Sequence, residues 1–483
     1  MLLLLLAVSL HQEQDRSKAA IYLQYQGGTN WFYTTFLAGT SNENYFDYGV
    51  IGAGLGARIG KDFFVFFTEL LFKQTLCGGL KDEIPEEAIP NTYNIEPAQQ
   101  PKGLYRNITG NQATAWGLLA AAEKANLPLF CGSYPITPAT DVLHELSKHK
   151  SLGVMTVQCE DEIAGCASAV GASYAGALAI TSTSGPGVCL KSEAMNLAVI
   201  AELPLVVLNV QRGGPSTGLP TKSEQTDLLQ ALYGRNGESP MPVIAAKSPG
   251  DCFDAAYMAC KIALEHMTPV VLLTDAFIAN GSAAWKLPNL ADYPAIQPPY
   301  VKPEMAGNWT PFQRNEETGV RYWAVPGQEG FMHRIGGLEK SNETGAISTE
   351  PENHHLMTVL RQQKVERIPV PDVEVEGAED AELLVVGFGG TYGHLHAAMD
   401  EMRAAGKKVA LAHFKYINPL PANTEEVMKK YPKVVVAEQN MGQFAGYLRM
   451  KIDGFVPNQY NEVKGQPFVV NELVAAFTEI YNK

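Results

Sequence analysis

Residues 158–187 read QCEDEIAGCASAVGASYAGALAITSTSGPG and carry the strongest structural signals in this 483-residue chain. Three carboxylates precede a run in which twelve of the fifteen residues from Ile163 to Ala177 are Ala, Gly, Ser or Cys. Such small side chains predict a helix that other backbones or a partner subunit can approach closely, and we expect this helix to be buried. A strand, ALAITSTS, follows and ends in Gly185-Pro186-Gly187. Parallel α/β folds place their ligands at such Gly-rich turns.

Glu162 stands at the start of this helix. An ionised acid in a buried position costs several kcal/mol unless it has a partner, so we expect Glu162 to have a specific one. The alternative is a plain N-terminal charge that favours the helix dipole by about 0.3–1 kcal/mol. Glu160 and Asp161 fit that alternative, and for Glu162 the residues alone leave both interpretations open.

Composition limits the classes of partner. The length predicts two or three domains with ample core. The net charge is −14 and the pI about 5.3, without a Lys/Arg cluster, so nucleic acid is an unlikely partner. Seven cysteines without a C-x-x-C pair indicate buried cytosolic thiols rather than a disulfide framework, an iron-sulfur cluster or a zinc site.

Residues 1–90 form an anomalous N-terminal segment. MLLLLLAVSL has the apolar run of a signal peptide but no basic residues before it, and it is too short to cross a membrane. The aromatic residues between Ile21 and Phe72, with Gly-rich breaks, resemble a fragment of a membrane β-barrel that has too few strands to close. The alternative is a divergent or damaged domain. GAGLGARIG fails as a dinucleotide motif because Ala57 replaces the third glycine.

Residues 102–283 predict one α/β unit with two notable loops. YPITPAT, residues 134–140, is stiffened by two prolines that would hold the Thr137 hydroxyl in place. LPLVVLNV predicts a parallel strand covered on both faces, and Arg212 follows near its carboxyl end, where open α/β sheets bind ligands. A guanidinium there suits a carboxylate or phosphate, although an intramolecular salt bridge is the alternative.

The rest of the chain predicts a long crossover and a second α/β domain. Residues 285–370 carry seven prolines between Pro288 and Pro326 and predict little regular structure before a helix. The adjacent His354 and His355 lie on different faces of that helix, which favours solvent over metal. From Pro371 the pattern is βαβ. The turn GFGGTYG suggests a nucleotide site, but no acidic residue ends the next strand to bind a ribose.

With these motifs in view, residues 91–483 resemble the alpha subunits of 2-oxoacid:ferredoxin oxidoreductases, most of all those that act on 2-oxoglutarate. The matching motifs occur in one order over about four fifths of the chain: YPITPAT, EDEIAG, TSGPG, QRGGPSTGLPTKSEQ, GGTYGHL and GQFAGYLRM. Longer alpha chains of the family also carry an N-terminal gamma-type domain, which residues 1–90 do not match.

The resemblance implies an α/β fold with two thiamine-enzyme-type domains. These are a pyrimidine-side domain at 91–284 and a transketolase C-terminal-like domain at 371–483, joined by the crossover at 285–370. It also implies thiamine diphosphate shared with a beta subunit that holds Mg²⁺ and an iron-sulfur cluster, with coenzyme A as co-substrate. We expect a cytoplasmic alpha2beta2 enzyme that reduces ferredoxin and contacts neither membrane nor nucleic acid.

The resemblance also assigns roles to residues. Thiamine reacts once its C2 proton is removed, which a carboxylate at N1′ of the pyrimidine promotes, and Glu162 takes that role. Arg212 and Thr137 are expected on the 2-oxo acid, and Lys222 is a weaker candidate for the distal carboxylate of 2-oxoglutarate. No metal ligand is expected in this chain. The expected cofactor-binding residues are Tyr134, Pro135, Ile136, Glu162, Ser184, Gly185 and Pro186.

Three alternatives stay open at this point. The substrate could be pyruvate or another 2-oxo acid rather than 2-oxoglutarate. The chain could be a transketolase-like half-enzyme with a different acceptor. It could also be a degenerate, non-catalytic binding subunit.

Overall fold

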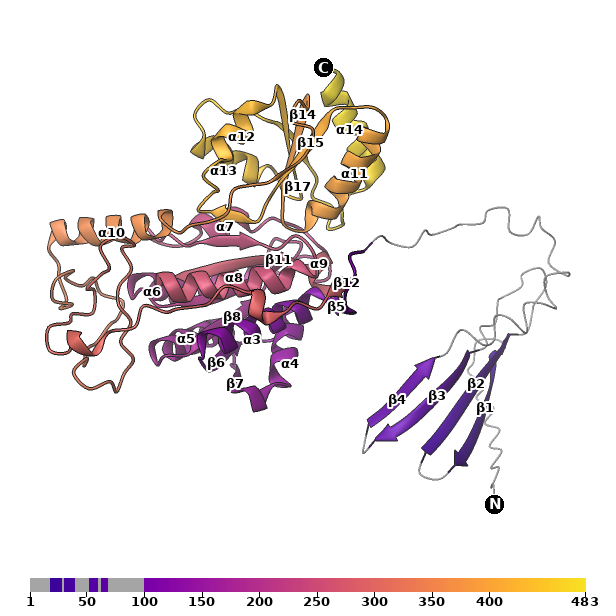
Figure 1. The fold of residues 1–483 in the computed structure, drawn as a ribbon, viewed down its shortest axis with the longest axis horizontal. Helices are drawn as coiled ribbons and strands as arrows, with labels where there is room; N and C mark the ends of the chain where they lie inside the picture. The colour runs from indigo at the N-terminus through magenta and orange to yellow at the C-terminus, as the bar shows by residue number, and fades with distance from the viewer. Residues whose placement is uncertain (1–17, 28–29, 40–51, 60–61, 68–99) are drawn as a thin grey trace. The chain divides into compact units, whose positions relative to one another are not determined.

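The computed structural model describes residues 18–27, 30–39, 52–59, 62–67 and 100–483. The chain divides into two compact units, Met1–Pro101 and Lys102–Lys483. In the first unit the described strands form an antiparallel sheet in the order β1-β2-β3-β4, drawn in indigo in Figure 1. Their bounds are Lys18–Gly27, Asn30–Gly39, Gly52–Ile59 and Asp62–Phe67. The signal-peptide-like residues 1–10 lie outside the described residues. Among those described, no helix is long and apolar enough to cross a membrane.

A seven-stranded sheet forms the centre of the second unit. Its order is β16-β10-β11-β9-β8-β6-β7, and all neighbours are parallel except β16, which is antiparallel to β10. Every residue of β9 and β11 is buried, which confirms the predicted strand covered on both faces. The bounds are β6 Leu129–Ser133, β7 Val154–Gln158, β8 Leu178–Thr183, β9 Leu205–Gln211, β10 Val243–Ala245, β11 Pro269–Asp275 and β16 Tyr416–Asn418.

Helices cover both faces of this sheet, and each side has its own hydrophobic core. One core contains residues of α3, α4 and α8, and the other contains residues of α5, α6 and α7. A short helix, α9, follows β11. The bounds are α3 Gly110–Ala125, α4 Thr140–Ser147, α5 Glu162–Tyr174, α6 Gly185–Ile200, α7 Leu228–Tyr233, α8 Asp251–His266 and α9 Ala276–Asn280.

The crossover has little regular structure, as its prolines predict. β12 (Ser282–Lys286) pairs with β5 (Tyr105–Thr109), and only two short 3-10 turns follow before α10 (Pro351–Glu366). Buried polar contacts fix this segment. Glu202, at the end of α6, accepts hydrogen bonds from Arg314 and Lys364 through its carboxylate and from Arg321 through its backbone carbonyl.

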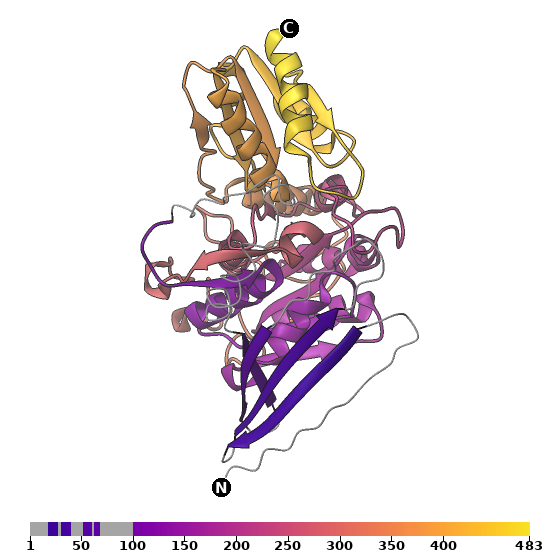
Figure 2. The same cartoon turned by 90° about the vertical axis from the view of Figure 1, so that its right-hand side faces the viewer.

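The C-terminal domain is a second α/β domain with its own sheet, seen in orange and yellow in Figures 1 and 2. Its sheet order is β13-β15-β14-β17-β18, parallel except at β13. The strands are β13 Val375–Gly377, β14 Leu383–Phe388, β15 Val409–Phe414, β17 Lys433–Glu438 and β18 Asn458–Asn461. The helices are α11 Tyr392–Ala404, α12 Thr424–Lys430, α13 Gln443–Lys451 and α14 Val470–Asn482. The predicted α/β fold with two such domains is confirmed.

Candidate active site

The motifs singled out in the sequence meet at one edge of the first sheet. β6, β8 and β9 are neighbours, and they lead into Tyr134, Ser184 and Arg212 respectively. Because the carboxyl ends of parallel strands share an edge, residues far apart in sequence come together there. Gly185-Pro186-Gly187 is the first turn of α6 rather than a free turn, so a helix N-terminus, which favours anions, joins this edge.

Glu162 is the first residue of α5, and Asp161 caps the helix by accepting a 2.8 Å hydrogen bond from the Ala164 amide. The Glu162 side chain is only 8% exposed. No hydrogen bond or ion pair joins its carboxylate to another residue in the described part of the chain. A Cβ at Gly187 would lie 2.8 Å from the Glu162 Cγ and 1.9 Å from the Thr183 hydroxyl, so only glycine fits beside this acid. The specific partner expected for Glu162 therefore stays a prediction.

The small residues of α5 allow the close backbone approach that the sequence predicts. A Cβ on Gly132 of β6 would lie 2.4 Å from the Gly165 carbonyl, and one on Gly165 would lie 3.1 Å from the Ser133 Cα. The prediction of a buried helix is right for one face only. Ile163, Ala167 and Gly171, one turn apart, are exposed because no element of residues 102–483 covers them.

Arg212 directly follows β9, is 6% exposed and points toward the proline-stiffened loop. Its Nη1 donates a 2.7 Å hydrogen bond to the Thr137 carbonyl, and its Nη2 donates a 3.2 Å bond to the Thr217 carbonyl. Its Nε is buried and has no partner among the described residues. Burial lowers the pKa of Arg212, and the nearby carboxylates of Asp227 and Glu162 oppose that shift. The described residues place no carboxylate within salt-bridge distance of Arg212, so they do not show the intramolecular salt bridge that was the alternative.

Two further polar residues belong to this edge and were missed in the sequence analysis. The Asn209 amide of β9 donates a 3.0 Å hydrogen bond to the Asp227 carboxylate, and a Cβ on Gly185 would lie 2.9 Å from that carboxylate. Burial raises the pKa of Asp227. The Asn209 amide in the middle of the strand LVVLNVQ was the available signal, because buried polar side chains require a partner.

Unpaired polar atoms mark the edge as a site that can hold a ligand. The Ser184 hydroxyl and the Asn209 Oδ1 are buried without a partner in the part of the chain that the structure describes, as is the Arg212 Nε. Buried polar atoms are normally hydrogen-bonded, and an unpaired one costs about 1–3 kcal/mol. A ligand with both hydrogen-bond donors and hydrogen-bond acceptors would satisfy these three atoms.

The other predicted site residues lie at the rim. Tyr134 and Thr137 are exposed, and Pro135 and Ile136 are partly buried beside them. Lys222 is exposed just after the loop closed by the Gly213–Leu219 bridge, its backbone carbonyl accepts a 2.9 Å hydrogen bond from the Gly213 amide, and its Cβ packs near Gly465. The structure thus brings Glu162, Arg212, Ser184 and Thr137 to one edge and leaves Lys222 on an exposed loop.

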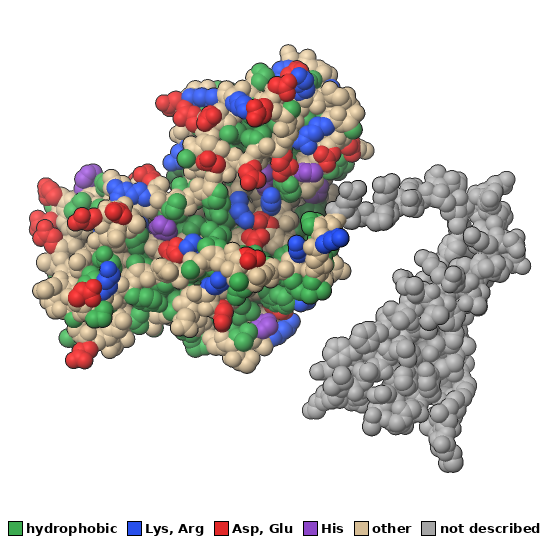
Figure 3. Space-filling view, in the orientation of Figure 1, with side chains coloured by type: hydrophobic (Ala, Val, Ile, Leu, Met, Phe, Trp, Pro, Cys, Tyr) green, Lys and Arg blue, Asp and Glu red, His purple; other side chains and the backbone are tan. Residues whose placement is uncertain are grey.

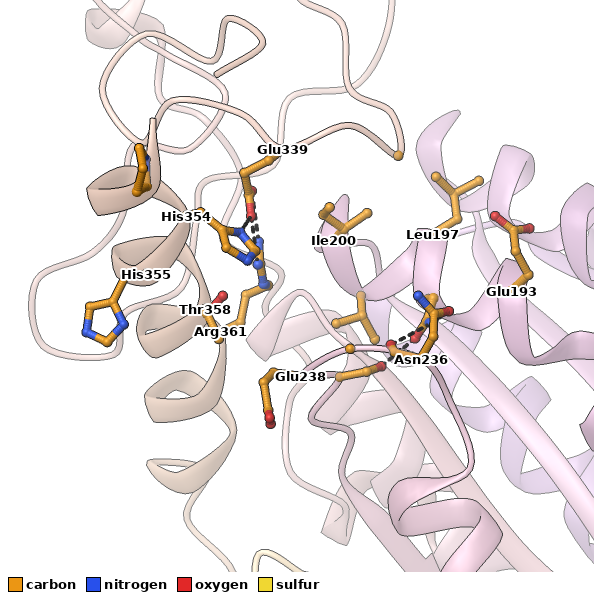
Figure 4. A pocket seen from close by; sticks show the side chains of 16 residues that line it. Glu193, Leu197, Ile200, Asn236, Glu238, Glu339, His354, His355, Thr358 and Arg361 are labelled. Atoms are coloured by element: carbon orange, nitrogen blue, oxygen red, sulfur yellow. Dashed lines mark hydrogen bonds and ion pairs between the residues drawn. The ribbon is translucent and has the colours of Figure 1, made fainter. Parts of the chain in front are cut away.

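A groove of about 580 Å³ lies elsewhere, between α6 and α10 (Figure 4). Glu339 binds both His354 and Arg361 on one side of it, and Glu193 and Asn236 lie on the other. No predicted site residue lines this groove. Both His354 and His355 are exposed. On the face shown in Figure 3, acidic and basic side chains are interspersed.

Two protein-family models match this chain. The thiamine diphosphate-binding model of pyruvate flavodoxin/ferredoxin oxidoreductases matches residues 121–351, and core domain II of pyruvate:ferredoxin oxidoreductases matches residues 381–471. The chain is 54% identical over 388 residues to the 2-oxoglutarate oxidoreductase subunit KorA of Mycobacterium tuberculosis. The aligned residues cover 80% of this chain and 59% of that protein.

Two other similarities extend this result. The 2-oxoglutarate synthase subunit KorA of Methanothermobacter thermautotrophicus is 32% identical over 342 residues, covering 70% of this chain and 88% of that subunit. A solved 2-oxoglutarate:ferredoxin oxidoreductase from Magnetococcus marinus, with 2-oxoglutarate, coenzyme A and succinyl-CoA bound, superposes with a TM-score of 0.76 at 32% identity. That match covers 86% of this chain and 75% of the solved chain. The chain spans about three fifths of the length of its Mycobacterium relative.

Proposed function

This chain belongs to the 2-oxoacid:ferredoxin oxidoreductase family as a relative of its alpha subunits, and on that premise we propose that it forms half of a thiamine-dependent active site. The reaction we propose converts 2-oxoglutarate, coenzyme A and two oxidised ferredoxins into succinyl-CoA, carbon dioxide, two reduced ferredoxins and a proton. The similarity to KorA subunits from two organisms supports 2-oxoglutarate over pyruvate as the substrate.

The observation that carries this proposal is the buried Glu162 carboxylate, which has no hydrogen-bond partner among the described residues. A carboxylate in that position suits a pyrimidine nitrogen, and the unpaired Ser184 hydroxyl beside α6 offers a second polar contact. The residues therefore fit thiamine diphosphate. It would be held by Glu162, by Ser184-Gly185-Pro186 and by the loop of Tyr134, Pro135 and Ile136.

Thiamine diphosphate, when bound, supplies the electron sink for decarboxylation of a 2-oxo acid. Glu162 would accept a hydrogen bond from the pyrimidine and hold its proton in the reactive tautomer. Arg212 would bind the carboxylate of the substrate through a guanidinium already oriented by the Thr137 and Thr217 carbonyls. Thr137 would contact the 2-oxo group, and Lys222 is our candidate for the distal carboxylate.

We assign the remaining chemistry to a beta subunit. Within residues 100–483 and the described strands before them, no group of three His, Cys, Asp or Glu side chains is arranged to hold a metal ion. We propose, on the resemblance to the family, that the Mg²⁺ and the iron-sulfur cluster belong to the beta subunit, in an alpha2beta2 assembly that reduces ferredoxin. Because coenzyme A and ferredoxin are used together, we expect the enzyme in the cytoplasm.

The test is to co-express the chain with its beta subunit and measure viologen reduction with a panel of 2-oxo acids. We expect activity that depends on coenzyme A and is highest with 2-oxoglutarate. Glu162→Gln should lower kcat about 10²–10⁴-fold while the complex still assembles, because the amide cannot replace the acid. Glu160→Gln is the matched control, since Glu160 is exposed just before the helix, and it should change kcat less than about twofold. Activity of Glu162→Gln within tenfold of the parent would contradict this role.

A further inference from the structure

Asp227 directly precedes helix α7, but its side chain does not cap that helix. An aspartate at the N-cap position normally accepts a hydrogen bond from a backbone amide of the first turn, and Asp227 makes no such bond. Asp161 and Asp275 hold the same position before α5 and α9, and both accept backbone amides there. The Asp227 carboxylate is therefore directed away from its own helix.

Strand β9 fixes the place of this carboxylate. On the face of β9 that packs against α6 and α7, Leu205 and Val207 belong to the hydrophobic core. The next two side chains on that face are the amides of Asn209 and Gln211. The Gln211 Oε1 accepts a 3.2 Å hydrogen bond from the Asp227 backbone amide, and the Asn209 Nδ2 donates a 3.0 Å bond to the Asp227 Oδ2. The two amides thus hold Asp227 at the edge of the sheet where the candidate site lies.

Asp227 and Glu162 both contact the first turn of α6. A Cβ on Gly185 would lie 2.9 Å from the Asp227 Oδ2, and a Cβ on Gly187 would lie 2.8 Å from the Glu162 Cγ. These glycines are the first and third residues of α6. Gly185 is also one of the residues that we propose to hold the cofactor, so Asp227 stands beside the proposed cofactor site as Glu162 does.

The atoms left unpaired next to this turn are hydrogen-bond acceptors. The Asp227 Oδ1 has no partner among the described residues, and the side chain is partly exposed, so a ligand can reach it. The Asn209 Oδ1 is buried and unpaired. Turning this amide over would place its oxygen against the Asp227 carboxylate, which fixes its orientation. Ionised 2-oxoglutarate carries acceptors only and cannot satisfy these oxygens, whereas an amino group can.

We propose that Asp227 is a second cofactor-binding acid, whose Oδ1 accepts a hydrogen bond from the amino group on the pyrimidine ring of thiamine diphosphate. Asn209 holds the other oxygen of the carboxylate, so that Oδ1 is presented in a fixed direction. This inference rests on the proposed function, in which Glu162 binds a nitrogen of the same ring. Two carboxylates then recognise the pyrimidine at separate atoms and fix how the ring is turned in the site.

The experiment compares two ligands that differ in this amino group. In oxythiamine diphosphate an oxygen takes its place. We would measure the dissociation constants of thiamine diphosphate and oxythiamine diphosphate for the cofactor-free complex with the beta subunit, by fluorescence titration with Mg²⁺ and without substrate or coenzyme A. Asp227→Asn removes the charge with little change in shape. Glu224→Gln is the matched control, because Glu224 is a buried acid of the same loop whose carboxylate accepts hydrogen bonds from the Gly214 amide and the Thr226 hydroxyl.

We expect the parent and Glu224→Gln to bind thiamine diphosphate at least about tenfold more tightly than oxythiamine diphosphate, because a carboxylate accepts from the amino group and repels the oxygen. Asp227→Asn should lose most of this preference, because its amide can donate to the oxygen. Any contribution of Glu162 to the preference is the same in all three proteins. It therefore cancels when their preferences are compared.

Two results overturn the proposal: a parent complex without the preference, and an Asp227→Asn complex that keeps the parent's preference within about twofold. Equal weakening of both ligands in Asp227→Asn is such a result, since it shows that Asp227 only supports the loop. If Asp227→Asn does not assemble, Asp227→Ser decides in its place, because serine lacks the carboxylate and suits the N-cap position. A parent complex that binds neither ligand shows instead that the proposed function is wrong.

Discussion

At the scale of single residues, Glu202 combines features that rarely occur together. Its backbone has a left-handed φ of 50°, which costs energy for a residue with a side chain, and its carboxylate is fully buried. Arg314 and Lys364 hold the carboxylate, and Arg321 binds the backbone oxygen, so three cations share one anion. Arg314 and Lys364 hold the pKa of Glu202 well below its usual range, while burial lowers the pKa of Lys364 to about 8. Glu202 therefore contributes more to the stability of this cluster than any one of its three cations.

Removing Glu202 should consequently cost more than removing one of its partners. Glu202→Gln leaves three buried cations without their anion and should destabilise the protein by about 3–5 kcal/mol. Lys364→Met leaves Glu202 paired with Arg314 and should cost about 1 kcal/mol. Thermal unfolding of the two variants, side by side at pH 7, measures this difference. Equal shifts in Tm would contradict the prediction.

The same variant has an expected pH dependence. Because the folded pKa of Glu202 is depressed, its contribution to stability is complete above the pKa of an unfolded glutamate, about 4.3, and is lost as the pH falls below it. The difference in Tm between the parent protein and Glu202→Gln should therefore be present near pH 6, where Lys364 is still protonated, and shrink below about pH 4.

At the scale of elements, the GFGGTYG motif at the end of β14 packs against the first domain. A Cβ on Gly390 would lie 2.1 Å from the Asp275 carboxylate at the end of β11. Next to it, the Gln225 amide donates to the Phe388 carbonyl at 2.7 Å, and the Gln225 side-chain oxygen accepts from the Gln439 amide at 3.1 Å. Asp275 also binds Ser223. The C-terminal domain thus fixes the end of the loop that starts at Arg212.

This packing predicts opposite outcomes for two glycines of one motif. Gly390→Ala should push the turn away from Asp275, loosen the loop after Arg212, and raise KM for the 2-oxo acid together with a lower Tm. Gly393→Ala is the control, because a Cβ there meets nothing within 4 Å and the residue lies in α11, where alanine is favoured over glycine by about 0.5–1 kcal/mol. Equal KM values for the two variants would show that the turn does not position the loop.

The elements also show which structural features could be predicted from the sequence and which could not. β9 was predictable because a predominantly apolar run shortly before Arg212 fits few structures other than a buried parallel strand. The half-exposed α5 was not, because a run of small residues indicates close approach without showing which face is covered. Asp227 was missed because it follows its motif in a loop, and its contact with Asn209 depends on how the chain folds between them. The role of Gly390 likewise depends on a contact between two domains.

At the scale of the whole molecule, the division of the chain at Pro101 separates the family-like part from the N-terminal unit. Both family matches, at 121–351 and 381–471, fall in the second unit. We therefore expect a chain starting at Lys102 to assemble with the beta subunit and to retain kcat and KM within about twofold of the full chain. Size-exclusion chromatography and steady-state kinetics of the two forms test this. A truncated chain that fails to bind its partner would show that the first unit is needed for assembly.

The short strand β16 has a consequence for anyone who wishes to divide this molecule. It comes from the C-terminal half of the chain but completes the first sheet by pairing with β10 through Val243 and Ile244. An isolated first domain would lose that partner and expose an apolar edge with unpaired backbone groups, which is a template for aggregation. Chains shortened for crystallisation, domain exchange between relatives or split-protein reporters should therefore keep residues 416–418 with the first domain, or place a charged residue on the exposed strand.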